Sequence, residues 1–157
     1  MRNRLKGVTL IETMLYIGLF SVIIIIVLNF MLSTQEATQR TDARSNISNI
    51  SNFISQHINY SFNKALSVDQ GTSIFDSSQG LLALQFPDGN KQYTLSNSRI
   101  YFDGIPITPS NTSVASFTLH PVYRGLDTII GVKIDIDILS NKNPSITDTI
   151  NLLLILR

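Results

Sequence analysis

Hydrophobic residues form one long run near the start of the chain. Residues 8–32 make a stretch of 25 residues in which Glu12 is the only charged side chain. An α-helix rises about 1.5 Å per residue, so this run is roughly 37 Å long and can cross a hydrocarbon core of about 30 Å. The pattern therefore predicts a membrane-spanning helix with one carboxylate inside it.

Helical periodicity continues beyond the run. Apolar residues recur at steps of three and four, which places them on one face of a helix. The residues between them are polar and mostly weak helix formers, so packing of the apolar face must hold this part of the helix. The pattern predicts one helix over residues 9–66, ending near Gly71, where glycine permits a left-handed turn. The residues of the apolar face are Ile47, Ile50, Ile54, Ile58, Phe62 and Leu66.

The pattern then changes to the alternation of β-strands. Pro87-Asp88-Gly89-Asn90 is a turn sequence between two β-prone segments, so we expect a hairpin there. Alternation is strict over residues 132–138, where the isoleucines are expected to face a core and the charged residues between them to face water. The expected strands cover residues 81–86, 91–95, 99–102, 105–107, 114–119, 128–139 and 147–156.

The order of these elements predicts an α+β fold, with a long N-terminal transmembrane-plus-amphipathic helix packed on a C-terminal antiparallel β-sheet head. The expected parts are a basic leader over residues 1–7, a transmembrane helix over 8–32, an amphipathic extension over 33–69 and a β-rich globular head over 70–157.

Composition narrows the chemistry available to this head. The 157 residues include no cysteine, which excludes disulfides, thiolate metal sites and cysteine catalysis. The net charge of +1 depends on Arg2, Arg4 and Lys6, because without them nine Lys and Arg face 11 Asp and Glu. The remaining surface is therefore not a basic platform for nucleic acid.

Three interpretations of the N-terminal segment compete. A cleaved secretory signal needs an apolar core of about 7–15 residues and a small-x-small cleavage site. The run here is longer, and Leu28-Asn29-Phe30-Met31-Leu32 offers no such site. A plain signal anchor explains the basic residues before Gly7 but not Glu12. An ionisable residue inside a membrane helix is costly and indicates a function, which favours the third interpretation, a helix that assembles with other chains.

The segment Lys6-Gly7-Val8-Thr9-Leu10-Ile11-Glu12 resembles the class III signal of type IV pilins and type II secretion pseudopilins. It shares with them a short basic leader, a glycine, the Thr-Leu-Ile-Glu sequence and the long apolar run. The resemblance implies cleavage between Gly7 and Val8 by a prepilin peptidase, a membrane aspartyl enzyme, and N-methylation of Val8. It also implies a role for Glu12 in subunit assembly, since cleavage creates an α-ammonium that one subunit can offer to the glutamate of another.

Two residues depart from the pattern of that family. Val8 stands where phenylalanine is usual, and Asn29 stands where many major pilins have a helix-kinking proline. The absence of this proline favours a minor subunit. The hairpin at Pro87-Asp88-Gly89, the Tyr101-Phe102-Asp103-Gly104 sequence and the late strand over residues 132–136 are similar to features of the J-type minor pseudopilins and the related W-type minor pilins.

The resemblance implies a non-enzymatic minor pilin or pseudopilin of a type IV pilus, type II secretion or competence filament. Its expected partners are other pilin or pseudopilin subunits, the prepilin peptidase, a membrane assembly platform and the lipid bilayer, with no nucleic acid bound by the isolated head. The chain is expected to cross the cytoplasmic membrane once, with its N-terminus inside and its head outside, before it enters a pilus or pseudopilus. The alternative is a membrane-anchored extracytoplasmic binding protein without a filament role.

Other residues that could carry chemistry have simpler explanations. His57 and His120 are the only histidines, and no Ser-His-Asp arrangement or Gly-rich phosphate loop accompanies them. Asp135 and Asp137 could form a carboxylate pair, but a solvated sheet face accounts for them. Asp88-Gly89-Asn90 and Asp103-Gly104 could offer oxygens to calcium, although both are ordinary turn sequences. We therefore expect no catalytic residue, no metal and no cofactor.

Overall fold

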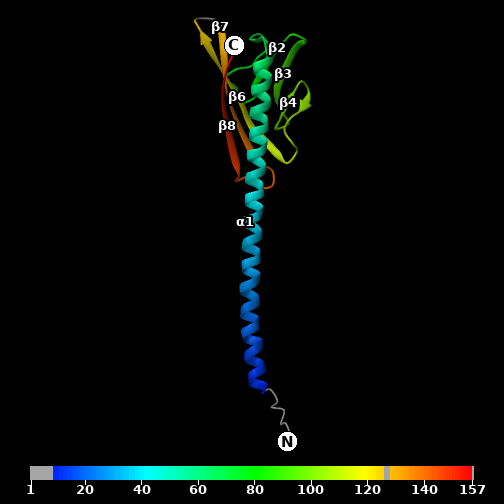
Figure 1. Cartoon of the computed structure of the whole chain (residues 1–157), viewed down its shortest axis with the longest axis vertical. Helices are drawn as coiled ribbons and strands as arrows, with labels where there is room; N and C mark the ends of the chain where they lie inside the picture. The colour runs from blue at the N-terminus through cyan, green and yellow to red at the C-terminus, as the bar shows by residue number, and fades with distance from the viewer. Residues whose placement is uncertain (1–8, 126–127, 157) are drawn as a thin grey trace. The chain divides into compact units, whose positions relative to one another are not determined.

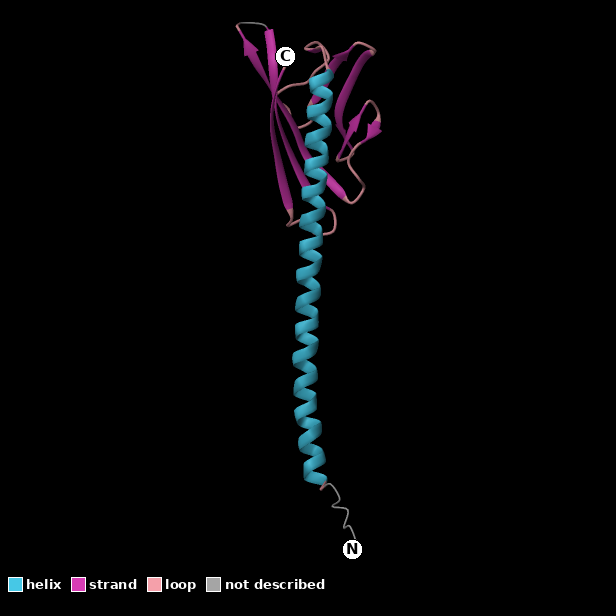
Figure 2. Ribbon diagram, in the orientation of Figure 1, coloured by secondary structure: helices cyan, strands magenta, loops and turns pink. Residues whose placement is uncertain are grey.

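The computed structural model describes residues 9–125 and 128–156. These residues form one long helix followed by strands only (Figure 1, Figure 2). The contacts within the chain divide it into residues 1–39 and residues 40–157, and the boundary falls inside the helix. The elements are α1 (Leu10–Lys64), β1 (Ser67–Val68), β2 (Leu81–Phe86), β3 (Gly89–Ser96), β4 (Arg99–Phe102), β5 (Ile105–Pro106), β6 (Thr112–Arg124), β7 (Thr128–Ser140) and β8 (Thr147–Ile155).

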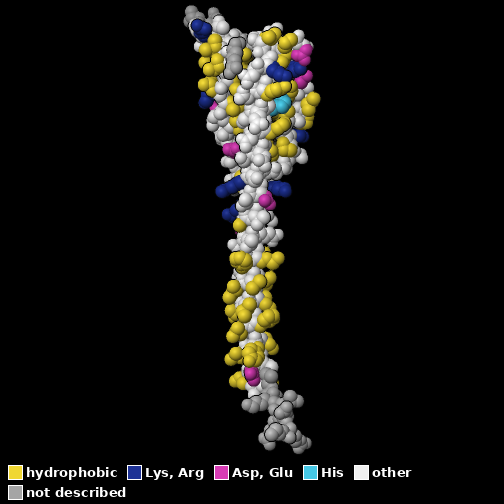
Figure 3. All heavy atoms as spheres, viewed as in Figure 1, with side chains coloured by type: hydrophobic (Ala, Val, Ile, Leu, Met, Phe, Trp, Pro, Cys, Tyr) yellow, Lys and Arg dark blue, Asp and Glu magenta, His cyan; other side chains and the backbone are white. Residues whose placement is uncertain are grey.

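The first part of α1 is exposed along its whole length. None of residues 10–39 is buried, although most of residues 10–32 are apolar, and Figure 3 shows hydrophobic side chains gathered along this segment. The segment is long and apolar enough to cross a membrane. Large exposed apolar surfaces of this kind are covered by lipid or by other protein chains. Residues 10–32 are therefore a candidate membrane span.

The strands of the second unit form two antiparallel sheets. One sheet has the order β1-β2-β3-β4-β5 and the other has the order β6-β7-β8. The sequence correctly predicts an α+β fold and the β2–β3 hairpin, in which Phe86 pairs with Gly89, but it predicts a single sheet. The first sheet ends at β5, which is only two residues long and ends at Pro106. Proline cannot donate a backbone hydrogen bond, and the chain leaves this sheet before β6 begins.

The second part of α1 supplies the helical side of the core. The expected apolar face is buried from Ile47 to Phe62, with Ile54 and Ile58 fully enclosed. The prediction for Leu66 is wrong, because this side chain is 65% exposed. The helix ends at Lys64, and the Leu66 backbone N–H donates to the Gln85 carbonyl at 2.8 Å, so Leu66 has left the helical face.

Both sheets contribute to one hydrophobic core against this helix. Strand β7 alternates as predicted over residues 132–138: Ile134, Ile136 and Ile138 are fully buried. Lys133 and Asp137 are exposed, while Asp135 is partly buried. Strand β6 continues through His120-Pro121 to Arg124, beyond the expected end at residue 119. Proline is tolerated there because β6 is an edge strand. The fully enclosed core residues of the sheets include Leu82, Leu84, Tyr93, Ile100, Phe117, Leu119, Val132, Ile134, Ile136 and Ile138.

Close packing of β7 against β8 leaves no room for a side chain at Gly131. A Cβ atom there would lie far inside contact distance of the Leu154 carbonyl oxygen, which is backbone and cannot turn aside. We expect Gly131→Ala to lower the free energy of unfolding by about 1–3 kcal/mol, measured by urea titration. Gly71→Ala is the matched control, since its Cβ would meet only Asp69 Oδ1 at 3.5 Å. Equal unfolding midpoints for the two variants would contradict this expectation.

Candidate functional site

Glu12 lies in the first turn of α1, on the exposed apolar segment. Its backbone N–H donates to the Thr9 carbonyl at 3.1 Å, and the Tyr16 hydroxyl donates to Glu12 Oε1 at 3.3 Å. Within residues 9–125 and 128–156, no ion pair involves this carboxylate. The N-terminal turn of a helix favours a negative charge, so the helix itself tolerates Glu12. Its surroundings of apolar side chains do not neutralise it.

Neighbouring polar groups on this segment are satisfied by the helix backbone. The Thr13 hydroxyl donates to the Leu10 carbonyl and the Ser21 hydroxyl donates to the Ile17 carbonyl, both at 2.8 Å. Such bonds allow hydroxyl groups to enter an apolar environment at low cost. Glu12 is therefore the only side chain in residues 10–32 whose negative charge would need a cation from outside the segment.

Gly7 and Val8 lie outside the described residues. The predicted cleavage between them and the predicted methylation of Val8 therefore stay predictions, and they rest on the sequence. Glu12 is the third residue of α1, which begins at Leu10, and it follows the expected new N-terminus by four positions in the sequence.

His57 belongs to a cluster of aromatic rings between α1 and the five-stranded sheet. Its Nδ1 atom lies 2.8 Å from the Tyr93 hydroxyl oxygen, and its ring meets the Phe102 ring edge-on at 5.1 Å between centroids. Burial lowers the pKa of His57 and raises the pKa of Tyr93, so both groups are held neutral. Sequence reasoning missed this contact, because the two residues are 36 positions apart and share no motif.

Acidification is expected to weaken the fold through His57. Its folded pKa lies below the usual value of about 6.5, so the unfolded chain binds a proton first and stability falls as the pH drops below that value. The difference in unfolding free energy between the wild type and His57→Gln should therefore shrink on acidification, because the variant cannot bind this proton. Urea titrations at a series of pH values measure this difference. A difference that grows as the pH falls would contradict the expectation.

His120 lies apart from His57 and joins other elements. Its Nδ1 atom is 2.6 Å from Asp76 Oδ1, and its Nε2 atom is 3.6 Å from Asp135 Oδ2, which also accepts from Lys133 at 2.9 Å. These contacts tie the loop between β1 and β2 to the three-stranded sheet. The two histidines are therefore not brought together.

Asp137 has different hydrogen-bond partners from Asp135, although both residues belong to β7. It accepts hydrogen bonds from Ser116 at 2.6 Å and Thr149 at 2.8 Å, which hold the pKa of this carboxyl below its usual range. The three side chains form one row across β6, β7 and β8. Such a row fixes the register of the strands.

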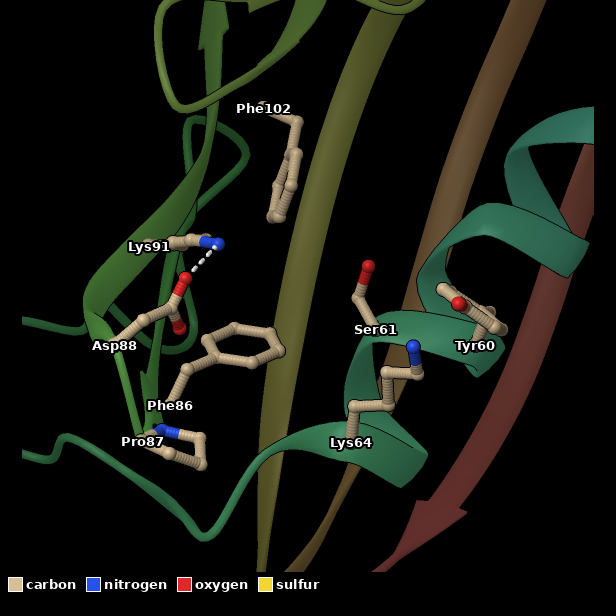
Figure 4. A pocket seen from close by; sticks show the side chains of 8 residues that line it. All are labelled: Tyr60, Ser61, Lys64, Phe86, Pro87, Asp88, Lys91 and Phe102. Carbon is tan, nitrogen blue, oxygen red and sulfur yellow. Dashed lines mark hydrogen bonds and ion pairs between the residues drawn. The ribbon is translucent and has the colours of Figure 1, made fainter.

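A groove lies between the end of α1 and the β2–β3 hairpin, and we call it the aromatic groove (Figure 4). It encloses about 440 Å³. Asp88, at the turn of the hairpin, accepts from Lys91 at 2.7 Å, and this bond lowers the pKa of the Asp88 carboxyl. The residues that line the groove are Tyr60, Ser61, Lys64, Phe86, Pro87, Asp88, Lys91 and Phe102. No sequence signal marks this groove, because its residues come from α1, β2, β3, β4 and the turn between β2 and β3.

Comparisons with known protein families, with curated proteins and with solved structures found no match to this chain. Its function is therefore inferred from its own residues.

Proposed function

We propose that the chain is a minor pilin or pseudopilin, a non-enzymatic subunit of a type IV filament system that is cut after Gly7. The observation that carries the proposal is Glu12, a single carboxylate on an exposed apolar helix that has the length of a membrane span. A free-standing anchor gains nothing from such a charge, which costs free energy in lipid. A helix that packs among copies of similar helices gains a specific contact from it.

Cleavage would supply the missing partner charge. A cut between Gly7 and Val8 creates an α-ammonium, and the stagger of neighbouring helices can bring this ammonium to Glu12 of another subunit. An ion pair in low-dielectric surroundings depends steeply on position, and removal of one partner is costly. The pair would therefore set the axial register of neighbouring subunits.

Residues 40–157 would form the head of the subunit. Their core draws on both sheets and on the second part of α1, and it uses no disulfide. Before assembly, the candidate membrane span would hold the subunit in the cytoplasmic membrane with this head outside, in agreement with the basic residues before Gly7.

Processing is the most direct test of this proposal. When the full chain is co-expressed with a prepilin peptidase, intact mass spectrometry should show loss of residues 1–7 from the wild type and an uncut Gly7→Ala variant. Gly18→Ala is the matched control, because a Cβ atom at Gly18 meets nothing within 4 Å, and it should be cut like the wild type. A wild-type chain that keeps its full mass beside an active peptidase would overturn the proposal in favour of the membrane-anchored binding protein.

A further inference from the structure

The aromatic groove combines apolar walls with a polar rim. Phe86 and Phe102 face Tyr60, Ser61 and Lys64 of α1 across it (Figure 4). Tyr60 is 62% exposed, whereas Ser61 is buried at the inner side. The volume of about 440 Å³ falls within the usual range of ligand sites, about 300–1,000 Å³. It fits one large side chain and part of its neighbour.

The charges around this groove do not balance. Lys91 is paired with Asp88 at 2.7 Å and lies 5.2 Å from the centre of the Phe86 ring. The Lys64 ammonium stands 4.4 Å over the Tyr60 ring, and no carboxylate of the described residues lies within ion-pair distance of it. The groove therefore presents one ammonium group without a partner charge, next to a set of aromatic rings.

We propose that the aromatic groove binds an extended segment of a partner protein in which a large apolar side chain stands next to a carboxylate. The rings of Tyr60 and Phe86 would contact the apolar side chain, and Lys64 would pair with the carboxylate. The unpaired ammonium group of Lys64 disfavours a segment that carries lysine or arginine at the same place, whereas the charge of Lys91 is already paired with Asp88. This inference stands whether or not the chain assembles into a filament.

Short peptides provide the probe. Acetyl-Gly-Phe-Asp-Gly-amide should bind the full chain in lipid nanodiscs, as judged by ligand-observed NMR titration. The analogue with Asn in place of Asp should bind about threefold less tightly, and the analogue with Lys should bind less tightly still. Adsorption to lipid is common to all variants of the protein and cancels when they are compared.

Substitutions in the groove separate the contribution of the Lys64 charge from that of the Tyr60 ring. Lys64→Gln should weaken binding of the Asp peptide about threefold and leave the Asn peptide unchanged, whereas Tyr60→Ala should weaken both. Tyr123→Ala and Lys142→Gln are matched controls, because both residues are exposed and lie outside the groove. Equal affinity of the wild type for the Asp and Lys peptides, or equal affinity of Tyr60→Ala and Tyr123→Ala for the Asp peptide, would overturn the proposal.

Discussion

Replacement of Glu12 by glutamine is expected to reduce the amount of the chain recovered in assembled filaments at least tenfold, without a change in membrane insertion. Glutamine keeps the size of the side chain and removes its charge. Under the proposed function, the α-ammonium of a neighbouring subunit would then be left without a partner in apolar surroundings. Breaking a buried ion pair costs about 3–5 kcal/mol, which is more than a tenfold loss requires.

The measurement is the fraction of the chain in sheared filaments, quantified by mass spectrometry in cells that carry the complete filament system. Glu36→Gln is the matched control, since Glu36 lies on the same helix, is exposed, and stands beyond the apolar run. The uncut Gly7→Ala variant should be as defective as Glu12→Gln, and the double variant no worse than either, because both changes remove the same pair. Normal recovery of Glu12→Gln would refute the role of the carboxylate in assembly.

Local patterns in the sequence predict much of this fold. The apolar face from Ile47 to Phe62 is buried, because helical spacing places these residues on one side whatever they pack against. The alternation of β7 and the hairpin at Pro87-Asp88 are likewise set by neighbouring residues. Each of these predictions rests on a local pattern alone, either apolar residues that repeat about every two residues in a strand or about every 3.6 in a helix, or a turn sequence.

Features that depend on distant residues were not predicted. The separation into two sheets depends on how β5 ends and where β6 pairs. The position of Leu66, between α1 and β1, is fixed by a hydrogen bond from its backbone N–H to Gln85 of β2. The aromatic groove and the His57–Tyr93 contact likewise join segments that no motif connects. By contrast, Glu12 could be singled out as a candidate from the sequence, because a charge within an apolar run is visible without a fold.

Ile54→Ala is expected to lower the free energy of unfolding of the head by about 2–5 kcal/mol. Ile54 is fully enclosed between α1 and the sheets, and its loss removes buried apolar contacts and leaves a cavity. Domains have only about 5–15 kcal/mol of stability in total, and this one has no disulfide to limit the loss.

Urea titration of the full chain in detergent measures this effect through the fluorescence of its tyrosines, among which Tyr93 is fully buried. Gln56→Ala is the control on the same helix, because Gln56 is exposed and surface substitutions of this kind change stability by about 0.5 kcal/mol or less. The polar residues between the apolar positions of α1 are weak helix formers, so residues 40–64 depend on packing more than on helix propensity. If Ile54→Ala unfolded at the same urea concentration as Gln56→Ala, the apolar face would not be what holds this part of the helix to the sheets.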